Sequence, residues 1–328
     1  MSSAVLVTGG AGYIGSLTVE RLAGAGWRVV VVDDLSQGHR AAVLPGVPLE
    51  VGDVGDQGLL RSVIEKHGVD SVIHFAAKSV VPESQDRPGD YYRTNVVASC
   101  SLLDAMAATG VRRIVFSSSA GVYGEPESVP ISETHGTHPL SVYGDTKLAF
   151  ERVLGWRATA GELEYVSLRY FNAAGASERF GEDHRPETHL IPNALRAVVG
   201  AAQGITVFGD DYETPDGTCI RDYVDVRDLA DAHIAALAAL GRGRSGVYNL
   251  GSGEGWSVLN VIDAVTRVTG KRVPRGVGAR RPGDPARLVA SSSLAERELG
   301  WKPAHRELAE MIEAAWRWTR RFPQGYPG

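Results

Sequence analysis

Short runs of aliphatic residues recur through the first half of the chain, and stretches with helical periodicity separate them. The strands that these runs predict are Ala4–Thr8, Val29–Asp33, Leu49–Val51, Ser71–Phe75, Arg113–Phe116 and Tyr165–Arg169. The predicted helices are Gly15–Ala25, Leu59–His67, Asn95–Thr109 and Tyr143–Ala160. Nearly continuous apolar strands are typical of a parallel sheet buried on both faces. Their alternation with helices predicts a doubly wound α/β fold, in which ligands bind at the carboxyl ends of the strands.

The pattern changes after about residue 173. A loop, Ser177–Thr188, precedes further predicted elements: a helix Leu190–Ala202, a strand Thr206–Phe208, a helix Val226–Leu240, a strand Val247–Leu250 and a final α-rich segment. We predict a first domain, residues 1–173, to which parts of about 222–250 return. A smaller, discontinuous α/β domain, residues 174–221 and 251–328, would bind the substrate.

Composition narrows the possible partners. The 328 residues include 34 Lys and Arg against 39 Asp and Glu, a net charge of −5 without a basic run, so we expect no nucleic-acid partner. Cys100 and Cys219 lack metal-ligand spacing and are too few for a disulfide framework. We expect no metal, no signal peptide, no membrane span and a cytoplasmic location.

A glycine-rich turn follows the first strand. Gly9, Gly12 and Gly15 have the spacing GxxGxxG at the start of a predicted helix. Such a turn lets backbone N–H groups approach a pyrophosphate at the positive end of the helix dipole. The second strand ends in Asp33-Asp34, where a carboxylate can accept hydrogen bonds from ribose hydroxyls and would repel a 2′-phosphate. The segment therefore predicts a Rossmann-type site for NAD.

The third strand also ends in an acidic residue, within Gly52-Asp53-Val54. Two interpretations stay open at this position. Asp53 could lie at the edge of the adenine, or it could cap the following helix.

A tyrosine and a lysine with i,i+4 spacing open a later predicted helix, in Tyr143-Gly144-Asp145-Thr146-Lys147. This spacing stacks both side chains on one face of the helix. Tyr143 is the expected base, because the Lys147 ammonium and the positive nicotinamide ring can lower its pKa. Ser119 follows the preceding strand and would hydrogen-bond the same substrate oxygen. We interpret Ser117 and Ser118 as turn residues.

Together these motifs resemble the extended short-chain dehydrogenase/reductase family. The resemblance rests on the glycine turn, the Ser117–Ala120 run, the Tyr143/Lys147 pair and Arg169-Tyr170-Phe171-Asn172. It continues to the end of the chain through His74–Lys78, Tyr91-Tyr92, Asp210–Tyr212, Asp216–Thr218, Arg221–Tyr223, Arg280–Asp284 and Pro323–Pro327. The later motifs are most similar to the subgroup of UDP-galactose 4-epimerases.

The resemblance implies an activity and two sets of contacts. The activity is NAD-dependent UDP-glucose/UDP-galactose 4-epimerisation, by transient oxidation at sugar carbon 4 and non-stereospecific return of hydride, in galactose metabolism or the supply of UDP-galactose. The expected cofactor contacts are Gly9, Gly12, Tyr13, Ile14, Gly15, Asp33, Asp34, Asp53, Val54, Phe75, Ala76, Ala77, Lys78, Asn95, Ser117, Tyr143, Lys147 and Tyr170. The expected UDP-sugar contacts are Ser119, Tyr143, Asn172, His189, Leu190, Phe208, Arg221, Arg281 and Asp284.

Three positions depart from relatives or bear on specificity. Gly121 stands where relatives often have Thr or Ala, and His189 where some have Asn. Leu288 occupies a position whose size is thought to influence acceptance of N-acetylated sugars, and its bulk favours glucose and galactose. The alternatives are an epimerase for N-acetylhexosamine, uronic acid or pentose UDP-sugars, a UDP-sugar decarboxylase, a 4,6-dehydratase or a non-catalytic NAD-binding regulator. A dehydratase is disfavoured because Ser119-Ala120-Gly121 contains no acid.

The same resemblance implies a homodimer. Its four-helix interface would consist of residues Tyr91–Thr109 and Tyr143–Ala160 from each chain.

Overall fold

The computed structural model describes residues 4–281 and 283–327, and its centre is a parallel sheet of seven strands. Their order across the sheet is β10-β6-β5-β4-β1-β2-β3. The bounds are β1 Ala4–Thr8, β2 Arg28–Asp33, β3 Leu49–Val51, β4 Val69–His74, β5 Arg113–Ser119, β6 Glu164–Tyr170 and β10 Gly246–Leu250. All neighbouring strands of this sheet pair in parallel. The predicted α/β fold is confirmed, and the strand Val247–Leu250 returns to the main sheet beside β6 as expected.

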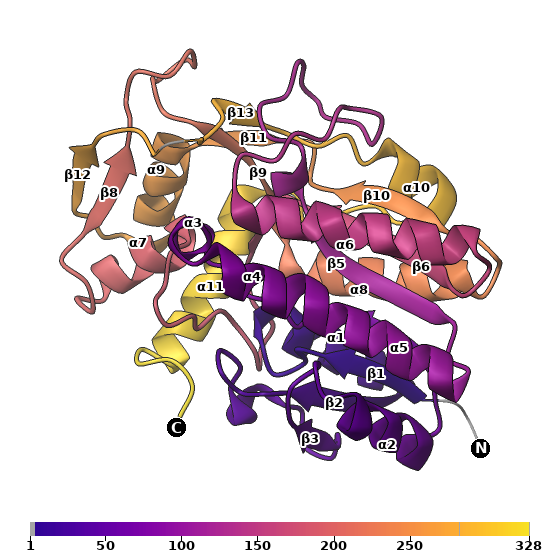
Figure 1. Cartoon of the computed structure of the whole chain (residues 1–328). Helices are drawn as coiled ribbons and strands as arrows, with labels where there is room; N and C mark the ends of the chain where they lie inside the picture. The colour runs from indigo at the N-terminus through magenta and orange to yellow at the C-terminus, as the bar shows by residue number, and fades with distance from the viewer. Residues whose placement is uncertain (1–3, 282, 328) are drawn as a thin grey trace.

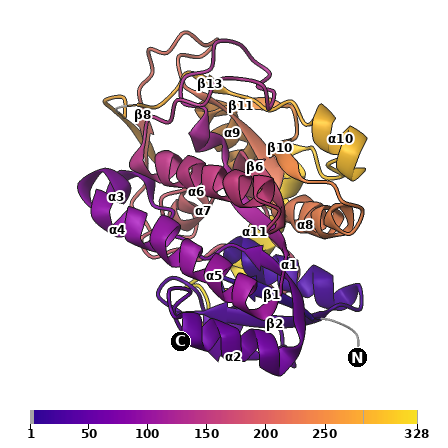
Figure 2. The same ribbon diagram turned by 45° about the vertical axis from the view of Figure 1, so that its right-hand side comes forward.

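Both faces of this sheet are covered by helices, which explains why apolar residues on β1 and its neighbours alternate between two core clusters. Val5 and Val7 of β1 pack in one core cluster with α1 (Tyr13–Gly24) and α8 (Val226–Leu240). Leu6 points to the opposite cluster, which α2, α5 and α6 cover. The bounds of these three helices are Gln57–His67, Ser99–Thr109 and Val142–Thr159. Figure 1 shows the two helical layers, and Figure 2 shows α5 and α6 side by side on one of them.

The segment before α5 departs from the prediction of one helix over Asn95–Thr109. The chain forms α3 (Val81–Asp86) and α4 (Pro88–Tyr92), then a π-helical stretch, η2 (Arg93–Ala98), before α5 begins at Ser99. Hydrophobic periodicity does not distinguish a single π-helical turn from a continuous α-helix. Such turns are frequent at functional sites.

A smaller α/β part packs beyond the carboxyl ends of the large sheet's strands. Its strands are β7 Asn172–Ala174, β8 Ile205–Phe208, β9 Ile220–Asp225, β11 Gly255–Ser257, β12 Arg275–Gly278 and β13 Arg287–Leu288. Strand β9 pairs with β7, β11 and β13, while β8 pairs with β12. The helices α7 (Leu190–Val198), α9 (Val258–Thr269) and α11 (Leu308–Arg321) share one apolar core with them. The expected α-rich final segment therefore also contributes three short strands.

The remaining helical elements are α10 (Ser293–Leu299) and two 3₁₀ turns, η1 (Arg40–Ala42) and η3 (Ala120–Val122). Within the described ranges, no helix combines the length and the apolar character that a membrane crossing requires.

Candidate active site

The glycine turn after β1 is a close-packed cradle at the start of α1. Gly9 has a φ of +72°, and a Cβ there would lie 2.6 Å from the Ala76 backbone nitrogen. A Cβ on Gly15 would lie 2.2 Å from the Gly9 carbonyl oxygen. No side chain caps α1, whose N-cap is Gly12, so backbone N–H groups of its first turn remain available to a ligand. These features fit a pyrophosphate and hence a dinucleotide.

Tyr13 and Ile14 belong to the first turn of α1. The Tyr13 hydroxyl donates to the Gly175 carbonyl oxygen at 2.7 Å, which ties this turn to the segment after β7. Ile14 packs partly buried against the core on the α1 side of the sheet. Both residues therefore hold α1 in place beside the predicted phosphate site.

Asp33 lies buried at the end of β2 and fixes the same turn. Its carboxylate accepts from the Ala11 nitrogen at 3.0 Å and from the Leu35 nitrogen at 2.9 Å. Burial raises the pKa of Asp33, while these two backbone hydrogen bonds oppose the shift. Each carboxylate oxygen keeps a further lone pair, so ribose binding by Asp33 stays a prediction. Asp34 is exposed and accepts from the Ser36 nitrogen at 2.9 Å.

The alternative role for Asp53, as the cap of α2, is wrong. Asp56 is the N-cap and accepts from the Leu59 nitrogen at 3.0 Å. Asp53 is exposed and accepts from the Gly55 nitrogen at 2.7 Å within its own turn. Val54 packs in the core with α2 and α5. Contact of Asp53 and Val54 with an adenine stays a prediction.

The segment after β4 passes the glycine turn and is held by Asn95. The Asn95 amide accepts from the Lys78 nitrogen at 2.8 Å and donates to the Lys78 oxygen at 3.0 Å. It also donates to the Thr146 hydroxyl at 3.1 Å. Asn95 therefore positions the backbone of Lys78 against α6. Phe75, Ala76 and Ala77, which precede Lys78 in the chain, are partly buried.

Tyr143 and Lys147 lie on one face of α6, as their spacing predicts. The Lys147 Nζ atom is 5.7 Å from the centroid of the Tyr143 ring and donates to the Ser117 carbonyl oxygen at 2.7 Å. Only 3% of Lys147 is exposed, so it is not a surface lysine. Burial lowers the pKa of Lys147 to about 7, against the effect of the Glu151 carboxylate. Burial raises the pKa of Tyr143, and the nearby Ser119 hydroxyl opposes that shift.

The serines before Tyr143 belong to β5, and the interpretation of Ser117 and Ser118 as turn residues is wrong. Strand β5 continues to Ser119, and all three serines lie in register with residues of β6. Ser118 donates to the Glu151 carboxylate at 2.5 Å. Ser119 lies at the end of the strand and accepts from the Gly121 nitrogen at 3.1 Å. A Cβ on Gly121 would lie 3.4 Å from the Ser119 oxygen, so glycine leaves space beside this hydroxyl.

The buried ion pair of Glu151 and Arg169, next to Lys147, was not predicted from the sequence. Glu151 follows Lys147 by four residues and forms a buried ion pair with Arg169, which donates to both carboxylate oxygens, at 2.9 and 2.5 Å. Arg169 also donates to the Tyr123 hydroxyl at 2.9 Å. The repetition Tyr143, Lys147, Glu151 at intervals of four was the available signal. Arg169 stood in the recognised motif, but its partner lies on another element.

Tyr170 ends β6 near this group. Its hydroxyl is buried and has no hydrogen-bond partner among the described residues. The ring contacts His233 edge-on, with centroids 5.8 Å apart. A buried donor without a partner is costly unless a ligand satisfies it, which fits the predicted cofactor contact.

The arginines expected at the nucleotide of the substrate gather on the smaller part of the molecule. Arg221 of β9 forms an ion pair with Asp284 and donates to the Ile220 oxygen at 2.8 Å. The guanidinium carbon of Arg281 lies 4.0 Å from the centroid of the Phe208 ring. The structure thus pairs Arg221 with Asp284 and Arg281 with Phe208, and all four are predicted UDP-sugar contacts. Pro282, between them in the motif, lies outside the described residues.

The remaining predicted contacts flank α7 and β7. Asn172 is the first residue of β7, and Leu190 is the first residue of α7. Partial desolvation lowers the pKa of the adjacent His189, whose side chain is 51% exposed, but the Glu182 and Glu187 carboxylates outweigh this effect and raise the pKa to about 9. The positive charge of Arg281 opposes that rise in pKa, which indicates that Arg281 lies close to His189.

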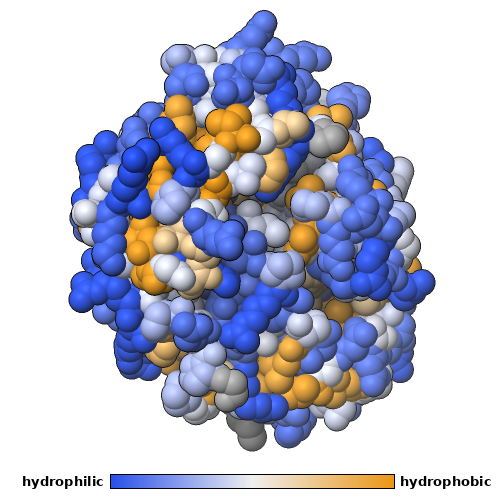
Figure 3. Space-filling model, turned by 90° about the vertical axis from the view of Figure 1, so that its left-hand side faces the viewer, coloured by the Kyte–Doolittle hydropathy of each residue, from blue (hydrophilic) through white to orange (hydrophobic). Residues whose placement is uncertain are grey.

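The loop that bears Arg281 approaches the start of the catalytic helix. A Cβ on Gly283 would lie 3.4 Å from the Leu140 Cβ, three residues before Tyr143. Leu288 of β13 packs against the apolar cluster that includes Ala120, Leu148 and Phe171. Figure 3 shows a hollow near the middle of the face that points left in Figure 1. The contact between Gly283 and Leu140 places the loop of Arg281 beside the start of α6, so the expected UDP contacts and the Tyr143/Lys147 pair are neighbours.

Comparisons with known proteins agree with this geometry. A sequence model of the NAD dependent epimerase/dehydratase family matches residues 5–251. The UDP-glucose 4-epimerase of Halalkalibacterium halodurans is 49% identical over 326 residues, with 98% of this chain and 97% of the relative covered. The solved structure of the Brucella ovis UDP-glucose 4-epimerase in complex with NAD has a TM-score of 0.93 and 46% identity, over 96% of this chain and 98% of that one. The Bifidobacterium longum UDP-glucose 4-epimerase in complex with NAD⁺ and UDP has a TM-score of 0.94 and 38% identity, over 99% and 100%.

Proposed function

The chain belongs to the NAD-dependent epimerase/dehydratase family, and on this premise we propose that it interconverts UDP-glucose and UDP-galactose by inversion at carbon 4 of the sugar. The observation that carries the proposal is the convergence of Ser119, Tyr143 and a buried Lys147 at the carboxyl end of β5. Relatives that are nearly half identical over almost the whole chain are UDP-glucose 4-epimerases. NAD, when bound, accepts a hydride from the sugar and returns it.

The residues of the chain have separate tasks in this reaction. Tyr143 removes the proton from the 4-hydroxyl group and later returns it, with Ser119 hydrogen-bonded to the same oxygen. Lys147 is held by the Ser117 carbonyl oxygen, and its ammonium stabilises the phenolate of Tyr143. The chain alone holds Tyr143 above its ordinary pKa, so a positive charge beside the ring is required before Tyr143 acts as a base.

The cofactor is held by the glycine cradle and by the segments after β2, β3 and β4. The free N–H groups of α1 would hold the pyrophosphate, and Asp33 and Asp34 would favour ribose hydroxyls over a 2′-phosphate. Lys78, positioned by Asn95, supplies a cation to the same ligand. The unpaired hydroxyl of Tyr170 would donate a hydrogen bond to the cofactor.

The UDP moiety is anchored away from the reacting carbon. Arg221 and Arg281 neutralise the diphosphate, for which a planar guanidinium is well suited. Phe208 offers a face for the uracil, and Asp284 accepts from the ribose. Because the binding energy is remote from carbon 4, the oxidised sugar can turn and present its other face while it remains bound.

One assay tests this function directly. The purified protein is incubated with UDP-galactose without added reductant, and the sugar products are separated. We expect UDP-glucose. A 4-keto-6-deoxy product would instead identify a dehydratase, and the absence of turnover with UDP-galactose and UDP-N-acetylgalactosamine would contradict the epimerase proposal.

The role of Tyr143 has its own test. Tyr143→Phe removes the proton acceptor, and we expect kcat to fall by about 10²–10⁴ while NAD stays bound. Tyr165→Phe is the matched control, because Tyr165 lies near the amino end of β6, away from the carboxyl ends of the strands. Near-normal activity of Tyr143→Phe would refute its role as the base.

We also propose that the enzyme is a homodimer. Three large side chains on α4, η2 and α6 face solvent: Trp156 is 75% exposed, Val97 61% and Tyr92 39%. An apolar surface on these helices supports the expected four-helix interface. Light scattering should give twice the chain mass, and Trp156→Glu should give a monomer. A monomeric mass for the wild type would contradict the interface.

Two further proposals concern organisation and location. Residues up to 173, with α8 and β10, would form the NAD-binding domain, and the rest would bind the UDP-sugar. This division is supported by α8 and β10 packing in the core of the large sheet. A cytoplasmic location is supported by the two free cysteines, Cys100 and Cys219.

A further inference from the structure

The loop between β7 and α7 brings four potential metal ligands together. Glu182, His184, Glu187 and His189 each offer one ligand atom, and these atoms lie within 4.8 Å of one another. The four residues are spaced Glu-x-His-x-x-Glu-x-His within eight positions. The expectation of no metal rested on the spacing of the cysteines, and none of these four residues is a cysteine.

Several nitrogen–oxygen distances in the cluster are close to those around a single coordinated ion. The His184 Nδ1 atom is 3.1 Å from Glu182 Oε1 and 3.8 Å from Glu187 Oε2. The His189 Nδ1 atom is 3.7 Å from Glu187 Oε1. Ligand atoms about 2.0–2.1 Å from a tetrahedral zinc ion are separated by about 3.3 Å. The closer contact between His189 Nδ1 and Glu182 Oε1 has to open when an ion enters.

The charge of the cluster suits a divalent ion. The side chains of Glu182 and Glu187 are only 8% and 3% exposed, and buried carboxylates require compensating positive charge. Both histidine rings approach the same oxygen of Glu182, with centroids 5.4 Å apart. One dication at this point would balance the charge of both carboxylates and would be within reach of both rings.

The chemistry of the donors selects the ion. Calcium and magnesium prefer sites made of oxygen atoms, whereas zinc combines imidazole nitrogens with carboxylate oxygens. Two nitrogen and two oxygen ligands around one centre correspond to a closed, tetrahedral zinc site.

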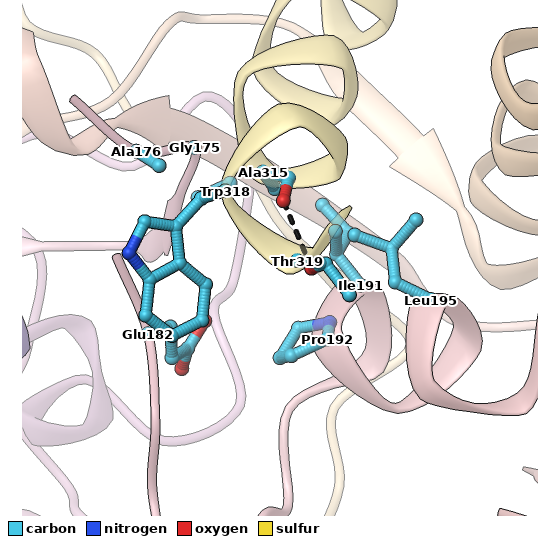
Figure 4. Close-up of a pocket in the computed structure, with 10 residues that line it drawn as sticks. Gly175, Ala176, Glu182, Ile191, Pro192, Leu195, Ala315, Trp318 and Thr319 are labelled. Atoms are coloured by element: carbon cyan, nitrogen blue, oxygen red, sulfur yellow. Dashed lines mark hydrogen bonds between the residues drawn. The ribbon is translucent and has the colours of Figure 1, made fainter. Parts of the chain in front are cut away.

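Surrounding contacts hold the ligands in position. The Glu187 carboxylate accepts from the Thr188 and His189 backbone nitrogens at 2.7 and 2.8 Å. The edge of the His184 ring meets Tyr13 of α1, with centroids 6.2 Å apart. Glu182 lies beside Trp318 at the wall of a small cavity between α7 and α11 (Figure 4). Contacts of this kind orient metal ligands before the ion arrives.

We propose that Glu182, His184, Glu187 and His189 bind one Zn²⁺ ion, which crosslinks the β7–α7 loop beside α1 and α11. Coordination through Nδ1 fixes the proton of His189 on Nε2, so this side chain faces a ligand as a hydrogen-bond donor. The role of His189 toward a ligand rests on the proposed function, since His189 is an expected substrate contact. The binding of zinc does not depend on the proposed function.

Metal binding is measured on untagged, full-length protein, without reference to turnover. The protein is treated with a chelator, reloaded with Zn²⁺ and dialysed, and its metal content is determined. We expect about one ion per chain and a Tm that rises by a few degrees with zinc. Reloading with Co²⁺ should give the intense visible absorption of a tetrahedral cobalt site.

Variants locate the ion. His184→Ala and Glu187→Gln should each weaken zinc binding by about tenfold or more and remove the cobalt spectrum. Glutamine at 187 keeps an oxygen for the two backbone N–H groups, so this variant remains informative if His184→Ala folds poorly. His138→Ala, which removes an exposed histidine outside the cluster, should retain one ion. Zinc below about one tenth of an ion per chain, or binding by both cluster variants as tight as that of the wild type, would show a cluster of ion pairs only.

Discussion

The buried ion pair behind Lys147 gives a prediction with a calculable size. Glu151 and Arg169 are 5% and 7% exposed at their side chains, and Arg169 donates to both carboxylate oxygens. Glu151→Gln leaves the guanidinium buried without its counter-charge. Removal of one partner of a buried pair costs about 3–5 kcal/mol. For 328 residues the entropy of unfolding is about 0.7 kcal/mol/K, so we expect Tm to fall by about 4–7 °C.

The same substitution should change the pH profile of the reaction. The Glu151 carboxylate raises the pKa of Lys147 against the effect of burial. Without it the pKa of Lys147 falls further, and the lysine loses its proton at a lower pH. We therefore expect the alkaline limb of kcat to move to lower pH, because the ammonium is the form that stabilises the Tyr143 phenolate.

Both effects can be tested by measuring Tm by calorimetry and kcat from initial rates between about pH 6 and 9, in steps of about 0.5. Glu162→Gln is the matched control, because Glu162 is 50% exposed and 3.4 Å from Arg157. An exposed pair of this kind contributes about 0–1 kcal/mol. A Tm loss for Glu151→Gln no larger than that of the control, with an unchanged pH profile, would refute the reasoning.

Two further predictions concern the cofactor cradle and the catalytic lysine. Gly15→Ala places a Cβ 2.2 Å from the Gly9 carbonyl oxygen and should weaken NAD binding by about tenfold or more in a fluorescence titration, whereas Gly24→Ala, with open space around its Cβ, should bind normally. For Lys147, the folded-state pKa of about 7 lies below the unfolded value of about 10.4, so the unfolded chain binds more protons between these pH values. Wild-type stability should then rise with pH above 7 by up to about 1.4 kcal/mol per unit in urea unfolding, and Lys147→Met should lose that slope; equal slopes would contradict the burial argument.

The parts of the fold that the sequence predicted are those with local causes. Strand β1 was predicted from its run of apolar residues, Ala4–Val7, whose side chains alternate between the core clusters on the two faces of the sheet. The pair Tyr143 and Lys147 follows from helical spacing alone. Strand β9 was not predicted, since its polar residues Arg221 and Asp222 are satisfied by partners distant in the sequence.

The candidate site divides in the same way. Asp56, rather than Asp53, caps α2, and both have a glycine two residues away, so the sequence offered little to separate them. The serines of β5 resembled a turn because hydroxyls are common in turns, yet Ser118 is committed to Glu151. Such assignments depend on which side chain lies opposite in the fold, and periodicity carries no information about it.

These observations explain why α6 has charged residues on its buried face. Tyr143, Lys147 and Glu151 repeat every fourth residue; Lys147 and Glu151 are buried, and Tyr143 is half-buried. A buried lysine destabilises the folded chain near neutral pH, and the helix would be more stable with an apolar residue there. Glu151 offsets part of that loss, but a lone buried carboxylate would add a penalty of its own. Arg169 removes this penalty through two hydrogen bonds, so the ion pair is best understood as the support that keeps a protonated lysine inside the protein.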